Sequence, residues 1–117
     1  MASPIDEATF AELLDMTGGD QAFVDELVDT YLEEGERLVA ALVAAAAAGA
    51  ADDLVRPAHS LKSSSLNVGA LELGELCRSL EEEARGGGGG DPVGQADAIR
   101  AAFAEARTAL LEERAQR

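Results

Sequence analysis

Residues 52–69 read DDLVRPAHSLKSSSLNVG and carry a clear helical pattern. Apolar or small side chains recur in it every three or four residues, the spacing that places side chains on one face of a helix. The acidic pair at its start favours the positive end of a helix dipole, and Asn-Val-Gly is a typical helix stop. We therefore expect a helix over about 52–67, whose inward stripe is formed by Leu54, Ala58, Leu61, Ser65 and Val68.

Pro57 falls inside this expected helix, two residues before His59, the one histidine of the chain. Proline is tolerated in a first turn, where its missing N–H costs nothing, but it kinks a helix interior. The sequence is compatible with either position. Because His59 follows Ala58 by one residue, it lies about 100° around the helix from the inward stripe and borders the solvent.

Helical periodicity also governs the rest of the chain. The segment Thr17-Gly18-Gly19-Asp20 combines a helix stop with a new N-cap, Gly49 is a second stop, and Asp91-Pro92 is a typical helix start after five glycines. From residue 21 we expect a long helix. Its apolar stripe is Phe23, Leu27, Tyr31, Leu38 and Leu42, widened by Val24, Val28, Leu32 and Val39.

Together these signals predict helices at about 6–16, 21–48, 52–67, 70–85 and 92–113. Four substantial helices with short loops and one apolar face each are typical of an all-α, antiparallel up-and-down four-helix bundle. The additional short helix lies at the N-terminus. A chain of 117 residues is the size of one domain, so we expect residues 1–117 to form a single domain.

Composition excludes several classes of function. The net charge of -14 would repel a phosphate backbone, which argues against nucleic acid as a partner. No stretch approaches the roughly 20 apolar residues of a membrane helix, and Met1 to Asp6 lack a signal-peptide pattern. With Cys77 as the only cysteine, no internal disulfide can form. We expect a cytoplasmic protein without membrane contact.

Sites for nucleotide or metal chemistry are not suggested by the sequence. The glycine run at 86–90 lacks the lysine and hydroxyl residue of a phosphate-binding P-loop. One histidine and one cysteine leave a metal ion short of its usual ligands, so we predict neither a metal site nor a cofactor.

His59 is the main candidate for chemistry. A neutral imidazole can attack phosphorus and form a covalent intermediate. Lys62, one turn further on, can offset the negative charge of a phosphoryl group. Val55, Arg56 and Ser63 share the face of His59 at helical spacing. Spacing alone favours a boundary histidine that carries no chemistry at His59, and a solvated lysine at Lys62.

The segment from Ala58 to Ala70, AHSLKSSSLNVGA, resembles the signature A-H-x-L-K-G-S-S-x-N-x-G-A of histidine-phosphotransfer (HPt) domains. The positions that follow it also resemble this family, whose pattern continues L-x-x-L-C-x-x-L-E. They are Leu73, Leu76, Cys77, Leu80 and Glu81.

The resemblance implies that His59 is the phosphoacceptor and that Lys62 stabilises the phosphoryl group. It implies a phosphorelay intermediate of two-component signalling, not an enzyme, which exchanges phosphate with an aspartate on response-regulator receiver domains and works with a hybrid sensor histidine kinase. The catalytic machinery, including Mg²⁺, is then expected on the partner. The receiver would dock on a surface comprising Val55, Arg56, Ser63 and Leu66.

One position departs from the family pattern, since Ser63 stands where glycine usually follows the lysine. Its hydroxyl either joins the hydrogen bonding at the site or crowds it slightly, which would slow transfer without abolishing it. Two alternatives stay open. The chain could be a helical adaptor that docks to receiver or kinase domains without being phosphorylated, or a phosphoacceptor domain of a chemotaxis-type kinase.

Overall fold

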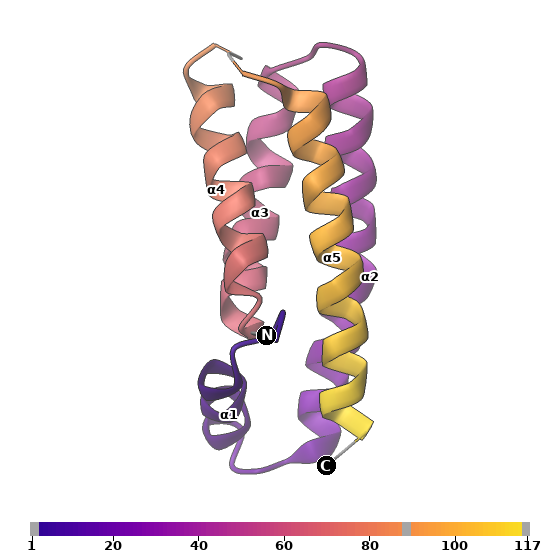
Figure 1. The fold of residues 1–117 in the computed structure, drawn as a ribbon. Coiled ribbons are helices and arrows are strands. Elements are labelled where there is room, and N and C mark those ends of the chain that lie inside the picture. The colour runs from indigo at the N-terminus through magenta and orange to yellow at the C-terminus, as the bar shows by residue number, and fades with distance from the viewer. Residues whose placement is uncertain (1–2, 88–89, 116–117) are drawn as a thin grey trace.

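The computed structural model describes residues 3–87 and 90–115, which form five α-helices and no strand (Figure 1). All-helical structure, expected from the sequence, is thereby confirmed for these residues. α1 begins after the expected start at residue 6, and α5 extends beyond the expected end at residue 113. The helices are α1 (Glu7–Met16), α2 (Gln21–Ala47), α3 (Asp52–Val68), α4 (Leu71–Arg85) and α5 (Pro92–Ala115).

Local side-chain chemistry sets several helix ends. Asp6 caps α1 by accepting a hydrogen bond from the backbone N–H of Thr9, and Asp20 caps α2 in the same way through Phe23. Gly69 ends α3 with a φ of 91°, a left-handed conformation that favours glycine. Each boundary therefore follows from a residue type that the sequence places at that point.

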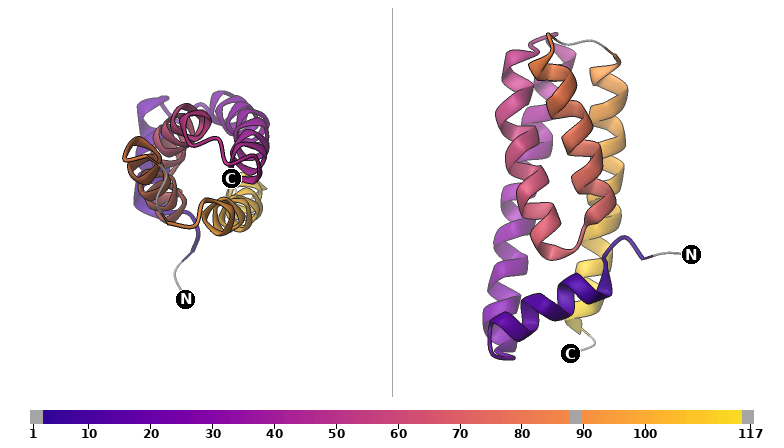
Figure 2. Two further views of the ribbon diagram at one scale, coloured as in Figure 1. Left: turned by 90° about the horizontal axis from the view of Figure 1, so that it is seen from above. Right: turned by 90° about the vertical axis from the view of Figure 1, so that its left-hand side faces the viewer.

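Four of the helices lie side by side around one core. α2 contacts α3 and α5, and α4 contacts the same two helices, so the four form a closed ring when viewed from above (Figure 2). α1 lies across one end, against α2 and α3. α3 and α4 are joined by a short connection and run in opposite directions, which places residues from the middle of α3 next to residues from the second half of α4.

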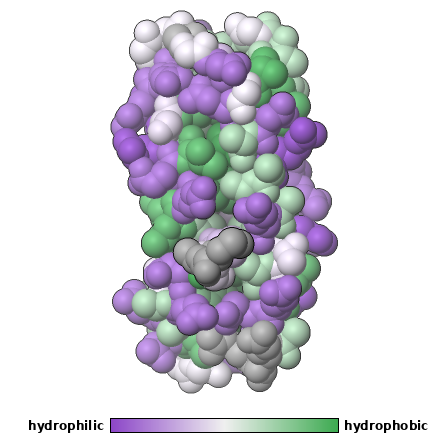
Figure 3. Space-filling view, viewed as in Figure 1, coloured by the Kyte–Doolittle hydropathy of each residue, from purple (hydrophilic) through white to green (hydrophobic). Residues whose placement is uncertain are grey.

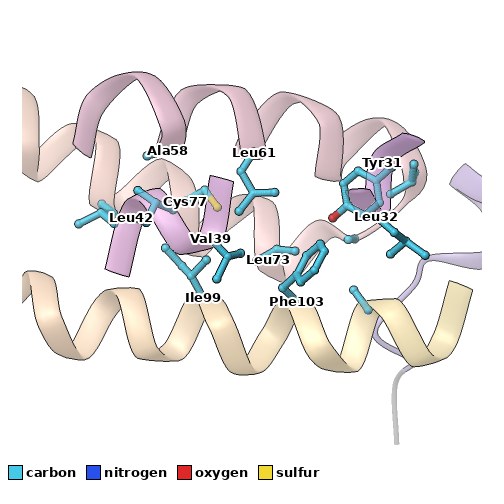
Figure 4. Close-up of a cluster of buried hydrophobic side chains, with 14 of the residues drawn as sticks. Tyr31, Leu32, Val39, Leu42, Ala58, Leu61, Leu73, Cys77, Ile99 and Phe103 are labelled. Carbon is cyan, nitrogen blue, oxygen red and sulfur yellow. The ribbon is translucent and has the colours of Figure 1, made fainter. Parts of the chain in front are cut away.

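The core is aliphatic and alanine-rich, with few aromatic rings (Figure 4). The inward stripe expected for α3 is buried throughout, as predicted. Its polar member, Ser65, is paired in the core with the hydroxyl of Tyr31 at 2.8 Å, which satisfies both buried groups. Burial also raises the pKa of Tyr31 to about 12.

The stripe predicted for α2 is partly wrong. Phe23 is 47% exposed, whereas its neighbour Val24 is fully buried. The buried stripe also includes Gly35, which faces the ring of Phe103 so closely that a Cβ at this position would collide with it. Glycine carries no hydrophobic signal, so the sequence pattern could not identify Gly35 as buried. Without that position, the apolar residues of α2 did not determine which side of the helix faces the core.

Pro57 lies inside α3, in its second turn, and so His59 follows a helical proline by two residues. The open question from the sequence is settled in favour of a position beyond the first turn. On the outside, hydrophilic residues cover much of the face in Figure 3, with hydrophobic residues between them. No helix within residues 3–87 and 90–115 is long and apolar enough to cross a membrane.

Candidate functional site

His59 projects from the middle of α3 toward solvent. Its side chain is 55% exposed, although Ala58 directly before it and Leu61 two residues after it are fully buried. Burial of those two neighbours anchors the backbone of α3 and leaves the imidazole on the outer edge of the helix. The backbone that carries the ring is therefore held in place, and the ring itself is accessible to another molecule.

One carboxylate on α4 connects His59 to Lys62. Oε2 of Glu81 lies 3.0 Å from Nδ1 of His59, and Oε1 of Glu81 accepts a hydrogen bond of 2.9 Å from Nζ of Lys62. The side chain of Lys62 is 23% exposed. The imidazole and the ammonium group thus lie on the same side of the molecule, as the spacing of the two residues on one helix requires.

A second cation reaches the same carboxylate from α4 itself. Arg85 donates from Nε and Nη2 to Oε2 of Glu81, at 3.1 and 2.9 Å. This is the oxygen that His59 also contacts, so the guanidinium group lies beside the imidazole. Arg85 is 59% exposed and was not expected at the site from the sequence.

The cations around Glu81 explain how an acid can be buried there. The residue is only 5% exposed, and burial alone would raise its pKa. Hydrogen bonding from Lys62 is the largest opposing influence, aided by Arg85 and His59, and together they lower the pKa of Glu81 to about 2. Glu81 is therefore an ionised carboxylate at neutral pH.

This ionisation decides which nitrogen of His59 carries the proton. An ionised carboxylate can only accept hydrogen bonds, so the contact with Glu81 requires a proton on Nδ1. In the neutral ring, Nε2 then keeps its lone pair. The site thus offers an exposed nitrogen nucleophile whose orientation is held from behind by Glu81, with two cations beside it.

The other predicted site residues surround His59 on α3. Arg56 and Ser63 are exposed, Val55 is half-buried, and Leu66 is 37% exposed. Leu66 lines a groove between α1, α2 and α3, and the sequence reasoning did not anticipate that groove. The other residues lining it include Leu13, Met16, Leu27, Thr30 and Asn67.

Glu81 was recognised in the sequence only as part of the HPt-like pattern, without a role of its own. A signal was nevertheless present, because Glu81 stands between Cys77 and Ala84 at the spacing of the inner face of α4. A carboxylate in such a position needs cationic partners. Arg85 is one turn further on, but its role could not be read from the chain alone.

The described residues contain neither a reactive thiol nor a metal-binding cluster. Cys77 is fully buried, and burial raises the pKa of its thiol to about 12, so it is not a reactive thiolate. Within residues 3–87 and 90–115, no group of three or more His, Cys, Asp or Glu side chains is arranged to hold a metal ion.

Comparison with known proteins points to one family. The Hpt domain family matches residues 26–109 of the chain. A similar solved structure is histidine-containing phosphotransfer protein B (HptB) from Pseudomonas aeruginosa PAO1, with 31% sequence identity and a TM-score of 0.89 over 100% of this chain and 99% of that one. No curated protein sequence gave a significant match. The matched residues include α3, α4 and the whole cluster around Glu81, and the chain belongs to the Hpt domain family.

Proposed function

We propose that His59 is the phosphorylated residue of this Hpt domain and that phosphate is bound through Nε2. The observation that carries the proposal is the contact between Nδ1 of His59 and the ionised carboxylate of Glu81. It leaves the other ring nitrogen unprotonated, in a side chain that is 55% exposed. A phosphorelay intermediate, which is the role of the family, needs a nucleophile of this kind.

The transfer step requires no proton transfer. Nε2 of His59 attacks the phosphorus of an aspartyl phosphate on the partner, and the N–P bond forms as the P–O bond breaks. The electron pair of the broken bond returns to the aspartate carboxylate. His59 keeps its Nδ1 proton and becomes a cationic ring facing Glu81. In the reverse direction, a neutral imidazole leaves.

Lys62 is proposed to stabilise the transferred phosphoryl group. Its ammonium group is held on the side of His59 by Glu81 and is partly open to solvent. Because the ammonium group is already in position before the reaction starts, it lowers the free energy needed to bring the negatively charged phosphoryl group and aspartate together. The chain itself would act as a phosphocarrier, with the catalytic groups and Mg²⁺ supplied by the partner receiver or kinase domain.

The architecture fits this carrier role. We infer that α2 to α5 form an antiparallel up-and-down four-helix bundle with α1 added at one end, and that residues 1–117 make up one HPt domain. Such a frame holds α3 rigidly on one side. We place the protein in the cytoplasm, where receiver domains would reach it.

The proposed partners are response-regulator receiver domains and a hybrid sensor histidine kinase. Val55, Arg56, Ser63 and Leu66 would form the docking surface with the groove beyond Leu66. The apolar residues that line the groove, among them Leu13, Met16 and Leu27, suit a partner that buries apolar side chains there. The ready orientation of His59 favours this carrier function over a helical adaptor that is never phosphorylated.

The experiment is a transfer assay with receiver domains. Each purified receiver domain is first phosphorylated with radioactive phosphate. It is then mixed, in the presence of Mg²⁺, with the wild-type protein or with His59→Gln. We expect acid-labile phosphate on the wild-type protein and none on His59→Gln. Folding of the variant is checked by circular dichroism. Stable docking of a receiver with no phosphate transfer would instead support the adaptor.

A further inference from the structure

Arg85 and His59 share one acceptor atom. Both contact Oε2 of Glu81, whereas Lys62 contacts Oε1. Because α3 and α4 run in opposite directions, Arg85 and Lys62 lie on opposite sides of the imidazole along the helix axes. The cluster therefore contains two cations that flank the proposed phosphoacceptor, held by a single carboxylate.

Phosphorylation changes the charges that act on Arg85. In the form that attacks phosphorus, the imidazole is neutral and the guanidinium group is the cation bound to Oε2 of Glu81. After it, the ring retains the Nδ1 proton and is cationic, so two cations share one oxygen and repel each other. The phosphoryl group on Nε2 adds a negative charge on the far side of the ring and attracts the guanidinium group.

The exposures of the two flanking cations indicate which can move. Lys62 is 23% exposed and partly enclosed, while Arg85 is 59% exposed at the end of α4. The long side chain of Arg85 can turn through solvent without displacing core residues. Arginine also matches phosphoryl oxygens with paired N–H donors, which a single ammonium group cannot do.

We propose that Arg85 changes partner when His59 is phosphorylated, leaving the Glu81 carboxylate and binding the phosphoryl group. Glu81 then pairs with the cationic ring and with Lys62. This inference rests on the proposed function, because it requires phosphate on His59. It assigns to Arg85 a role in binding the phosphoryl group and to Glu81 the role of holding Arg85 ready.

The test uses phosphoramidate as the donor, so that no partner protein is needed. Nε2 of His59 attacks its phosphorus, the P–N bond of the donor breaks, and the nitrogen leaves as ammonia after taking a proton from water. Rates are measured for the wild-type protein, Arg85→Gln, Arg85→Lys and Arg78→Gln. Arg78 is a matched control, since it is an exposed arginine on α4 whose ion pairs are with Glu75 and Glu82.

We expect Arg85→Gln to be phosphorylated about 5-fold more slowly at low salt, and Arg78→Gln to stay within about 2-fold of wild type. Arg85→Lys should recover part of the rate, and added salt should narrow the difference. In NMR spectra, the Nε–H resonance of Arg85 should shift on phosphorylation while that of Arg78 does not. The shift reports a change around Arg85, and the rate difference between Arg85→Gln and Arg78→Gln assigns that change to binding of the phosphoryl group.

Two results would overturn the inference. One is equal rates for Arg85→Gln and Arg78→Gln, and the other is an Arg85 Nε–H resonance that phosphorylation leaves unchanged. Failure of the proposed function looks different, because the wild-type protein would then form no phosphohistidine at all. The melting temperatures of all variants are compared first, so that a rate difference is not a folding difference.

Discussion

Nδ1 of His59 lies 3.0 Å from Oε2 of Glu81, across the interface between α3 and α4. The two residues are 22 positions apart in the chain, and their contact joins an exposed ring to a buried acid. This contact selects the tautomer of His59 and aims its free nitrogen outward. The chemistry proposed for the chain depends on it.

Glu81→Gln should slow phosphorylation of His59 by about 10-fold. A glutamine amide can donate to Nδ1 as well as accept from it, so the variant no longer forces the proton onto that nitrogen. The rate with phosphoramidate measures the effect. Glu82→Gln, which alters an exposed acid paired with Arg78, is the control and should behave as wild type.

The stability conferred by Glu81 should depend on pH in a defined direction. Its folded-state pKa is lowered from 4.5 to about 2, so its contribution is fully present above pH 4.5 and is lost as pH falls toward 2. Unfolding by urea is measured for the wild-type protein and Glu81→Gln between pH 6 and pH 2, a range of about four units. The gap between the two free energies of unfolding should shrink as the pH falls. A gap that stays constant over the range contradicts the lowered pKa.

Lys62→Gln should reduce the rate of transfer from a phosphorylated receiver domain by about 10-fold or more. The variant removes the ammonium group that is held beside His59, and Lys62→Arg should retain a substantial part of the rate because it keeps the charge. Quench-flow measurements with the same receiver compare the variants. Unchanged transfer in Lys62→Gln would show that this ammonium group does not act on the phosphoryl group.

Ser63→Gly should raise the transfer rate from a receiver domain by about 2- to 5-fold while lowering stability by about 0.5 kcal/mol. Removing the exposed side chain lets the partner approach His59 more closely, and glycine weakens the helix. Phosphoramidate is small, so the rate with this donor should change little. Ser60→Gly is the control for the loss of helix stability. A faster rate in that variant too would assign the effect to helix flexibility.

Gly35→Ala should destabilise the protein by about 1–3 kcal/mol without changing the chemistry of His59. The added Cβ would meet the ring of Phe103, which packs directly on the backbone of α2. In a Phe103→Leu background the same substitution should cost less, because the obstructing ring is gone. Urea unfolding of the four proteins gives both costs, and equal costs in the two backgrounds would contradict the direct contact.

The sequence predicted the local features of this structure better than the contacts between helices. The inward stripe of α3 and the aspartate caps follow from residues a few positions apart, so their pattern is visible in the chain. The burial of Gly35 depends on Phe103, far away in the sequence, and no hydrophobic pattern marks a glycine.

In the candidate site too, the local features could be predicted from the sequence and the contacts between helices could not. His59 and Lys62 stand one turn apart on one helix, so their proximity could be predicted from spacing. Their common partner Glu81 and the neighbouring Arg85 come from α4. Which acid lies opposite which cation depends on how far α3 and α4 are displaced along each other, and periodicity carries no information about that displacement.

The most direct test identifies the ring nitrogen that carries phosphate. The protein is labelled with ¹⁵N at histidine, phosphorylated by a receiver domain, and examined by NMR for coupling between phosphorus and each nitrogen of His59. We expect coupling to Nε2, with Nδ1 still protonated and facing Glu81. Phosphate on Nδ1 of His59, or on another residue, would contradict it.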